Sequence, residues 1–118
     1  MELDNAMARA CVEVGTERHV GRLREHHLPT GFCYLQEGKD LTPVAHIVGT
    51  GGIFRVTQAA RTIFSGARSD AGPAFLLKPT QPRMWIDRDY VMWAVGLLAE
   101  SAPDAAFALL RRYLVEVT

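Results

Sequence analysis

The sequence predicts one small α/β domain whose elements follow the order α-β-β-β-α-β-α-α, with helices and strands alternating only over the second half. Three observations support this fold class. The 118 residues, 48% of them hydrophobic, are enough for a single core and a single domain, residues 1–118. Apolar residues recur at helical spacings near the start of the chain. A short apolar run before Gly49 is typical of a buried strand that leads through glycines into a helix.

A first helix is expected from Glu2 to about Gly21. Its apolar positions recur at spacings of three and four and form a stripe, which consists of Leu3, Met7, Ala10, Cys11 and Val14. We interpret this stripe as the face that packs on the core, with a partner-binding face as the alternative. Gly15 and Gly21 weaken the helical pattern in its second half.

Two strands are expected next, from Leu23 to Leu28 and from Phe32 to Gln36, joined by a turn at Pro29-Thr30-Gly31. The adjacent His26 and His27 invite comparison with a metal site. Neighbouring side chains on a strand point to opposite faces, however, and no partner stands at ligand spacing in the sequence. We therefore interpret both as surface histidines and predict no metal site.

The central feature is the turn from Gly49 to Gly52, which joins a strand, Val44 to Val48, to a helix, Ile53 to about Phe64. Its three glycines allow positive φ and a close approach of the backbone to a ligand. The first amides of the following helix have no partner within it and suit a phosphate or a ribose. A tight connection without a ligand explains the glycines equally well.

The turn follows neither common phosphate-binding pattern. A Walker loop requires Lys and Ser or Thr after its last glycine, whereas Ile53 follows Gly52. In the dinucleotide pattern the third glycine would fall at Phe54, and the unit would begin nearer the start of the chain.

Beyond this helix we expect an exposed loop, Ser65 to Ala74, as the most mobile segment. A short strand, Arg83 to Asp87, follows it. The next helix, Tyr90 to Ala99, is apolar on nearly every side, which predicts that it is buried against the sheet. A last helix begins near Ser101 and carries arginines toward its end, where the helix dipole favours them.

The sequence also predicts the roles of two aspartates and two tryptophans in this part of the chain. Asp87 or Asp89 is expected to cap the start of the helix from Tyr90. Trp85 and Trp93 are expected in the core.

Composition limits the function classes. Thirteen basic and thirteen acidic residues balance, and no basic run exceeds two residues, so we expect no nucleic-acid partner. The longest apolar stretch, Val91 to Ala99, is about half of what a bilayer requires, and Met1 to Glu13 lacks the apolar core of a secretory leader. We therefore expect no membrane partner. Cys11 and Cys33 are isolated in sequence, as reduced thiols of a cytoplasmic protein are.

Four stretches, in order, resemble the C-terminal end of one family, the glutamate mutase L (MutL) proteins, and the resemblance extends from about Arg18 to Leu110. The stretches are Glu17-Arg18-His19-Val20-Gly21, Gly38-Lys39-Asp40-Leu41-Thr42, Ile47-Val48-Gly49-Thr50-Gly51-Gly52, and Trp85-Ile86-Asp87-Arg88-Asp89-Tyr90 running into Gly96-Leu97-Leu98. That family resembles the actin-like ATPases, which are built from two ribonuclease H-like halves around a nucleotide cleft. The resemblance implies a ribonuclease H-like subdomain and a chaperone-like ATPase that supports or reactivates adenosylcobalamin-dependent aminomutases.

The resemblance also implies which residues bind a ligand. Gly49, Thr50, Gly51 and Gly52 correspond to the adenosine motif, so ATP or ADP is the expected ligand, at a partial site and with no covalently bound cofactor. Lys39 and Asp40 are the next candidates, because a polar pair in the turn before the strand could face the same cleft. A solvated turn explains them as well. Asp87 is the third candidate, although its capping role already accounts for it.

Family members are several times longer, and the chain lacks the half that carries their phosphate motifs and acidic residues. The resemblance therefore implies no catalytic residue here and no ATP hydrolysis by this chain alone. The expected partner is the missing N-terminal half or an aminomutase subunit. One alternative is a non-catalytic interaction module that self-associates, as a homodimer, or docks on a mutase. A free-standing enzyme is disfavoured, since no nucleophile, paired-carboxylate or metal constellation can be assembled from the sequence.

Overall fold

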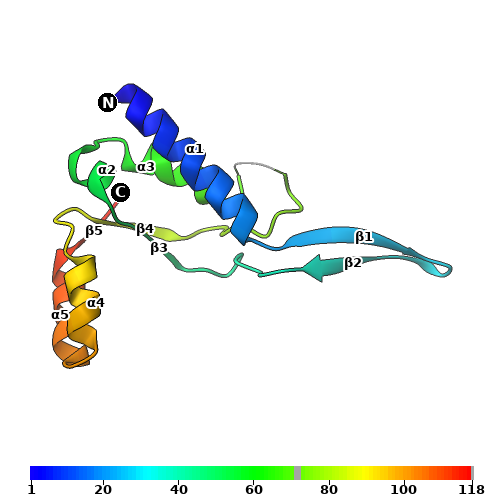
Figure 1. Ribbon diagram of the computed structural model, residues 1–118. Coiled ribbons are helices and arrows are strands. Elements are labelled where there is room, and N and C mark those ends of the chain that lie inside the picture. Colours follow the sequence, from blue (N-terminus) through cyan, green and yellow to red (C-terminus); the bar gives the residue numbers. More distant parts are fainter. Residues whose placement is uncertain (71–72, 118) are drawn as a thin grey trace.

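The computed structural model describes residues 1–70 and 73–117 and shows a mixed α/β chain with two small sheets (Figure 1). In chain order the elements are α1 (Glu2–His19), β1 (Arg22–Leu28), β2 (Gly31–Glu37), β3 (His46–Gly49), α2 (Gly52–Val56), α3 (Ala60–Phe64), the 3-10 turn η1 (Ser65–Ala67), β4 (Arg83–Asp87), α4 (Met92–Ala99), α5 (Pro103–Tyr113) and β5 (Leu114–Glu116). The α/β class is confirmed. The order differs from the prediction in two places, because the helix after the glycine turn is divided and a strand, β5, follows α5.

Strands β1 and β2 form an antiparallel hairpin, which we call the arm (residues 22–37). Its register runs from the pair Arg22 and Glu37 to the pair Leu28 and Gly31, so the predicted hairpin is confirmed. The arm projects from the rest of the molecule, and nearly all of its side chains are exposed (Figure 1).

The second sheet has the strand order β3-β4-β5 and places the glycine turn at its edge. Strands β3 and β4 are parallel, from the pair His46 and Arg83 to the pair Gly49 and Ile86. Strand β5 pairs antiparallel with β4 on the other side. Parallel strands need a crossover connection, and this one contains α2 and α3.

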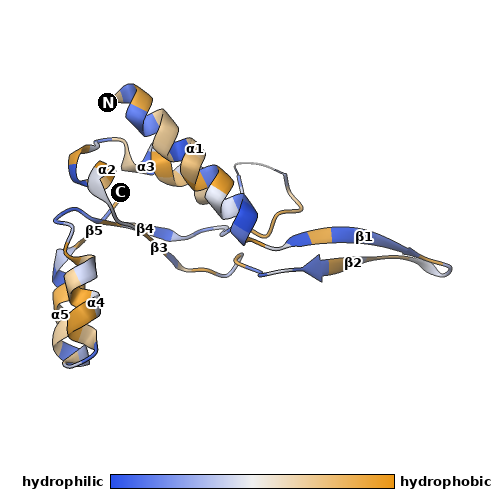
Figure 2. Ribbon diagram, viewed as in Figure 1, coloured by the Kyte–Doolittle hydropathy of each residue, from blue (hydrophilic) through white to orange (hydrophobic). Residues whose placement is uncertain are grey.

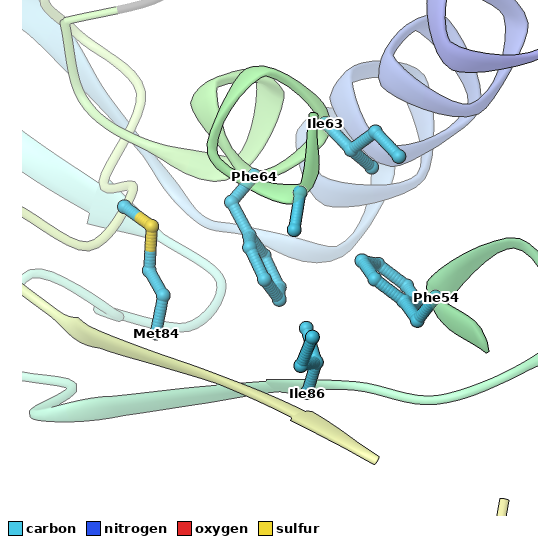
Figure 3. Packing of buried hydrophobic residues seen from close by; sticks show 6 residues of the cluster. Phe54, Ile63, Phe64, Met84 and Ile86 are labelled. Atoms are coloured by element: carbon cyan, nitrogen blue, oxygen red, sulfur yellow. The ribbon is translucent and has the colours of Figure 1, made fainter. Parts of the chain in front are cut away.

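The core lies between this sheet and helices α1, α2 and α3 (Figure 3). Phe54 and Phe64 stack with ring centroids 5.2 Å apart and cover Ile86 of β4. Ile63 and Met84 complete the same cluster. The turn after β3 is therefore attached directly to the best-packed part of the molecule.

Helix α1 forms as predicted, but the predicted core-facing stripe is wrong. None of its residues, all of which the structure describes, is buried, and Leu3 and Met7 are 71% and 59% exposed. The face that packs on the core instead carries Ala8 and Val12, four residues apart. Small side chains let α1 lie close to η1, where a Cβ on Gly66 would meet the Arg9 carbonyl oxygen at 2.8 Å.

The single helix predicted from Ile53 to Phe64 is two short helices, because Thr57 interrupts it. The Thr57 backbone is extended at φ −72° and ψ 142°. Its hydroxyl accepts a hydrogen bond from the Ala59 amide at 2.9 Å and donates one to Asn5 Oδ1 at 2.7 Å. A threonine hydroxyl that binds nearby backbone competes with the helix, which explains the break.

The prediction that the helix from Tyr90 is buried against the sheet is wrong. Helix α4 packs on α5 to form a helical hairpin that extends away from the core (Figure 1). Trp93 is 64% exposed, so its predicted core position is wrong. Trp85 is half-buried on the outer face of the sheet, where its Nε1 donates to His46 Nδ1 at 3.0 Å and the Arg83 guanidinium lies 4.8 Å from its ring centroid.

The loop predicted from Ser65 to Ala74 is only partly exposed. Its first residues form η1, where Gly66 and Ala67 are buried against α1. Residues 71 and 72 of this prediction lie outside the described residues. After the loop, Lys78 is buried and pairs with Glu17 of α1 at 3.1 Å, which fixes the returning chain to the first helix.

Candidate functional site

The turn that follows β3 has the backbone that its glycines predict. Gly51 has φ +116°, a conformation that side chains with a Cβ rarely adopt. Gly49 is required for another reason, since a Cβ there would lie 2.5 Å from the Phe54 ring and 2.7 Å from the Phe64 ring. At Gly52, where α2 begins, a Cβ would meet no heavy atom of the described chain within 4 Å. Sharp reversal and close packing thus account for two of the three glycines.

A pocket of about 410 Å³ opens beside this turn, between it and helix α1. The residues that line it come from three places, and they are Cys11, Val12, Gly15 and Thr16 of α1, Ile47, Val48, Gly49 and Thr50 of β3 and the turn, and Phe54, Phe64 and Ala67 behind them. Among these residues none is charged. The pocket thus presents apolar side chains, two hydroxyls and the main chain of the turn. Gly51 and Gly52 are not part of the described wall.

Gly15 is a pocket residue that the sequence analysis did not identify. It lies within α1, opposite Gly49, and also lines the adjacent pocket of about 340 Å³ beside His46. A Cβ at Gly15 would meet none of the described heavy atoms within 4 Å, so no close contact within the chain accounts for this glycine. A glycine inside a helix destabilises it relative to alanine, and this unfavourable choice is the sequence signal that could have identified the position.

Asp87 connects the turn to the helical hairpin. Its side chain is only 1% exposed, and its Oδ2 accepts hydrogen bonds from the Thr50 hydroxyl at 3.0 Å and the Met92 amide at 2.9 Å. Oδ1 accepts from the Val91 amide at 2.9 Å. The carboxylate therefore binds the amides of Val91 and Met92 at the start of α4. The N-cap residue itself is Val91, and not Asp87 or Asp89 as predicted. The structure also brings Asp87 together with Thr50 of the turn.

Lys39 and Asp40 lie at the base of the arm and do not line the pocket beside Gly49. The Lys39 carbonyl accepts a hydrogen bond from the Gly21 amide at 2.7 Å. The Asp40 carboxylate accepts from the hydroxyl and the amide of Thr42, at 2.6 and 2.9 Å, and these bonds lower the pKa of Asp40. The structure thus gives both residues a place in a closed turn, and it does not bring them to the glycines.

The described residues contain neither a metal-ligating cluster nor a helix suited to crossing a membrane. Within residues 1–70 and 73–117 there is no cluster of three or more His, Cys, Asp or Glu side chains suited to a metal ion. His26 and His27 pair with Cys33 and Phe32 across the arm. None of the helices in the described part of the chain is long and apolar enough to cross a membrane.

Comparisons with known proteins match the chain to a single protein family. The family described as "MutL protein" matches residues 1–114. The protein named "Protein MutL" from Clostridium tetanomorphum is 38% identical over 117 residues, which is 99% of this chain. The chain spans a quarter, 25%, of the length of that relative. No solved structure matches the chain.

Proposed function

The chain belongs to the MutL protein family, as its resemblance to glutamate mutase L proteins predicted, and from this premise we propose that it supplies the adenosine side of an adenine nucleotide site. The site comprises the turn from Gly49 to Gly52 and the pocket between this turn and α1. ATP or ADP is the proposed ligand, held without a covalent bond.

The observation that carries the proposal is the chemistry of the pocket wall. Its volume of about 410 Å³ is in the range of about 300 to 1,000 Å³ that small-molecule sites occupy. Apolar side chains with no charged group among the described lining suit an uncharged purine and ribose better than a phosphate. The Thr16 hydroxyl offers a hydrogen bond for orientation, and the Thr50 hydroxyl, whose proton is donated to Asp87, can accept one. The phosphates would extend toward protein outside this chain.

Two parts of the proposal concern the larger assembly. The sheet, with parallel β3 and β4 joined through α2 and α3, forms part of a ribonuclease H-like half of an actin-like ATPase. The remainder of a longer MutL-like chain, or an aminomutase subunit, supplies the phosphate side. Phosphoryl transfer depends on metal and charge arranged around the transferred group, so this chain alone does not hydrolyse ATP.

The biological role follows the family resemblance. In this proposal the complete protein is a chaperone-like ATPase that supports or reactivates an adenosylcobalamin-dependent aminomutase in the cytoplasm. Cys11 and Cys33 are free thiols, which suits a reducing compartment.

The proposal is tested by calorimetric titration of the chain with adenosine, ADP and ATP, compared with guanosine. We expect all three adenine ligands to bind with similar affinity, because the phosphates find no charged group in the pocket wall. In Gly15→Leu the new side chain occupies the pocket, and binding weakens at least about tenfold, the equivalent of roughly 1.4 kcal/mol.

The matched control is Gly96→Leu, the same substitution at a second helical glycine whose Cβ position is open. It lies on α4, away from the pocket, and should bind adenine ligands as the unchanged chain does. Absence of binding by the unchanged chain, or equal loss in both variants, would contradict the nucleotide assignment.

A further inference from the structure

Strand β3 lies at the edge of the three-stranded sheet, and one side of its main chain is unpaired. The Arg83 amide donates to the Ala45 carbonyl at 2.8 Å, and the parallel register then assigns the main chain of Ile47 to β4 as well. Main-chain groups of successive strand residues point alternately to the two sides of the strand. The N–H and C=O groups of His46 and Val48 therefore point to the free edge, where no described residue pairs with them.

A continuous groove follows this free edge. The pocket of about 410 Å³ is lined by the chain from Ile47 to Thr50, and the adjacent pocket of about 340 Å³ is lined by Val44, His46 and Ile47. Both pockets are lined on their other side by α1. The seven residues from Val44 to Thr50 span roughly 20 Å when extended, which is the usual length of a strand. We call the two pockets together the edge groove.

The wall of the edge groove suits an uncharged extended chain. Neither pocket has an Asp, Glu, Lys or Arg residue in its described lining. Gly15 of α1 lies in both pockets, and a Cβ there would meet none of the described heavy atoms within 4 Å. A glycine at such a place lets another main chain approach α1 closely. A segment from outside this chain would therefore account for Gly15.

The edge of β3 also lacks the features that prevent strand addition. Exposed edge strands are usually protected by lysine, proline, a bulge or a covering segment. The four residues of β3, His46-Ile47-Val48-Gly49, include no lysine, proline or acidic residue, and their pairing with β4 is regular. An unprotected edge inside an uncharged groove is typical of a strand that pairs with a further strand.

We propose that the edge groove binds an uncharged extended segment from the remainder of a longer MutL-like chain, which adds as a strand to β3. The segment pairs with the main chain of His46 and Val48, and its side chains at alternate positions contact α1. Because the match to this chain covers 25% of the Clostridium tetanomorphum relative, three quarters of that protein lie outside it and contain candidate segments. The pairing ends at Val48, so the turn from Gly49 to Gly52 remains at the end of the added strand.

The strands of a second copy do not suit the edge groove. Figure 2 shows hydrophilic segments on both strands of the arm. Arg24 and Glu25 are neighbours on β1, so their charges lie on both faces of that strand, and β2 carries Glu37. These charges would enter a groove whose described wall has no charge to pair with them, which is unfavourable. The β3 edge of a second copy is flanked by its own α1, so two such edges do not meet while both helices stay in place.

The probes that test the proposal are overlapping synthetic peptides of about ten residues, which cover the part of the Clostridium tetanomorphum relative outside the match. Fluorescence anisotropy identifies a peptide that binds, and hydrogen exchange followed by NMR locates it. In the chain alone the amides of His46 and Val48 should exchange quickly. Those of Ile47 and Gly49 are bonded to β4 and should exchange slowly. The bound peptide should slow exchange at His46 and Val48 by at least about tenfold.

Two neighbouring substitutions form a matched pair. Val44 lines the edge groove, and Val44→Glu places a carboxylate in it, so peptide binding should weaken at least about tenfold. Ala45 is exposed and is not among the residues that line the groove, so Ala45→Glu should bind the peptide as the unchanged chain does. Val48→Pro removes an N–H that faces the groove without removing a bond to β4, and it should also weaken binding. Circular dichroism checks that each variant is folded.

Three outcomes would overturn the proposal. If no peptide slows exchange at His46 and Val48, no strand adds to β3. Equal binding by Val44→Glu and Ala45→Glu would place the contact outside the edge groove. Protection of the same amides that grows with the concentration of the chain alone would assign the edge to a second copy. Adenine ligands are absent from these experiments, and Val44 does not line the pocket proposed for adenosine, so the result is independent of nucleotide binding.

Discussion

At the scale of single residues, Asp87 has the largest structural role near the proposed site. A buried carboxylate is costly unless its oxygens are satisfied, and here one hydroxyl and two amides donate to it. Because these donors come from the turn and from the start of α4, Asp87 fixes the position of the helical hairpin relative to the pocket wall. The sequence indicated an aspartate at the start of this helix, but it did not predict that the carboxylate binds the helix from four residues before the N-cap residue, Val91. It gave no sign of the bond to Thr50, which depends on tertiary structure.

We predict that Asp87→Asn destabilises the chain by about 2 to 3 kcal/mol, because the amide has one acceptor oxygen and its NH₂ group faces a donor. Urea denaturation followed by circular dichroism measures the change. The matched control is Asp89→Asn, at an exposed position two residues further on. Its free energy of unfolding should stay within about 0.5 kcal/mol of that of the unchanged chain. Equal stability of Asp87→Asn and the unchanged chain would mean that the hydrogen bonds from Thr50 and α4 do not form in solution.

At the scale of elements, local patterns predicted most of the helices and strands, and tertiary contacts decided the rest. The arm, β4 and the glycine turn follow from alternation and turn residues. Strand β5 has only three residues, directly after α5, and it exists because its backbone pairs with β4. Periodicity alone cannot identify so short a strand. At the break in the helix, Thr57 combines a local bond to the Ala59 amide with one to Asn5, 52 residues away. The open pocket required the position of α1, which no local pattern specifies.

Strand β5 is also held by one ion pair, so its attachment should depend on pH. Arg83 donates from Nε and Nη2 to the two carboxylate oxygens of Glu116, both at 2.7 Å. These hydrogen bonds lower the pKa of Glu116 below its ordinary value of 4.5. A carboxyl whose pKa is lowered by folding contributes stability that is complete above the unfolded pKa and is lost as pH falls through the folded pKa.

We therefore predict that β5 loosens as pH falls below about 4.5, the unfolded value. The Arg83 guanidinium lies over Trp85, so the chemical shift of the Trp85 indole N–H in an NMR titration should change in one step as β5 loosens. Glu116→Gln should remove it. Asp40→Asn, which changes another carboxyl with a lowered pKa, should retain it. Persistence of the step in Glu116→Gln would assign it to another group.

At the scale of the whole molecule, the chain is less compact than its length predicts. A compact domain of 118 residues has a radius of gyration of about 13.5 Å. The observed value is 17.3 Å, with principal extents of 57 × 38 × 21 Å. The arm and the helical hairpin account for the difference, because each projects from the body (Figure 1). Composition indicated enough apolar residues for a core, but it did not predict that many of them lie on these two projections.

This shape predicts an uneven distribution of stability. The arm is a two-stranded sheet exposed on both faces, and such hairpins are marginal in water. Strand β4 lies between β3 and β5 and contributes Met84 and Ile86 to the core.

In native-state hydrogen exchange we expect the β4 amides to exchange only through global unfolding, while the arm amides exchange through local opening that needs less free energy. The difference should exceed about 2 kcal/mol, since global stability of small domains is about 5 kcal/mol or more. Added urea should then accelerate exchange in β4 strongly and in the arm weakly, because local opening exposes little surface. Equal protection and equal urea dependence in the arm and β4 would mean that the arm is packed against something in solution, most simply another copy of the chain.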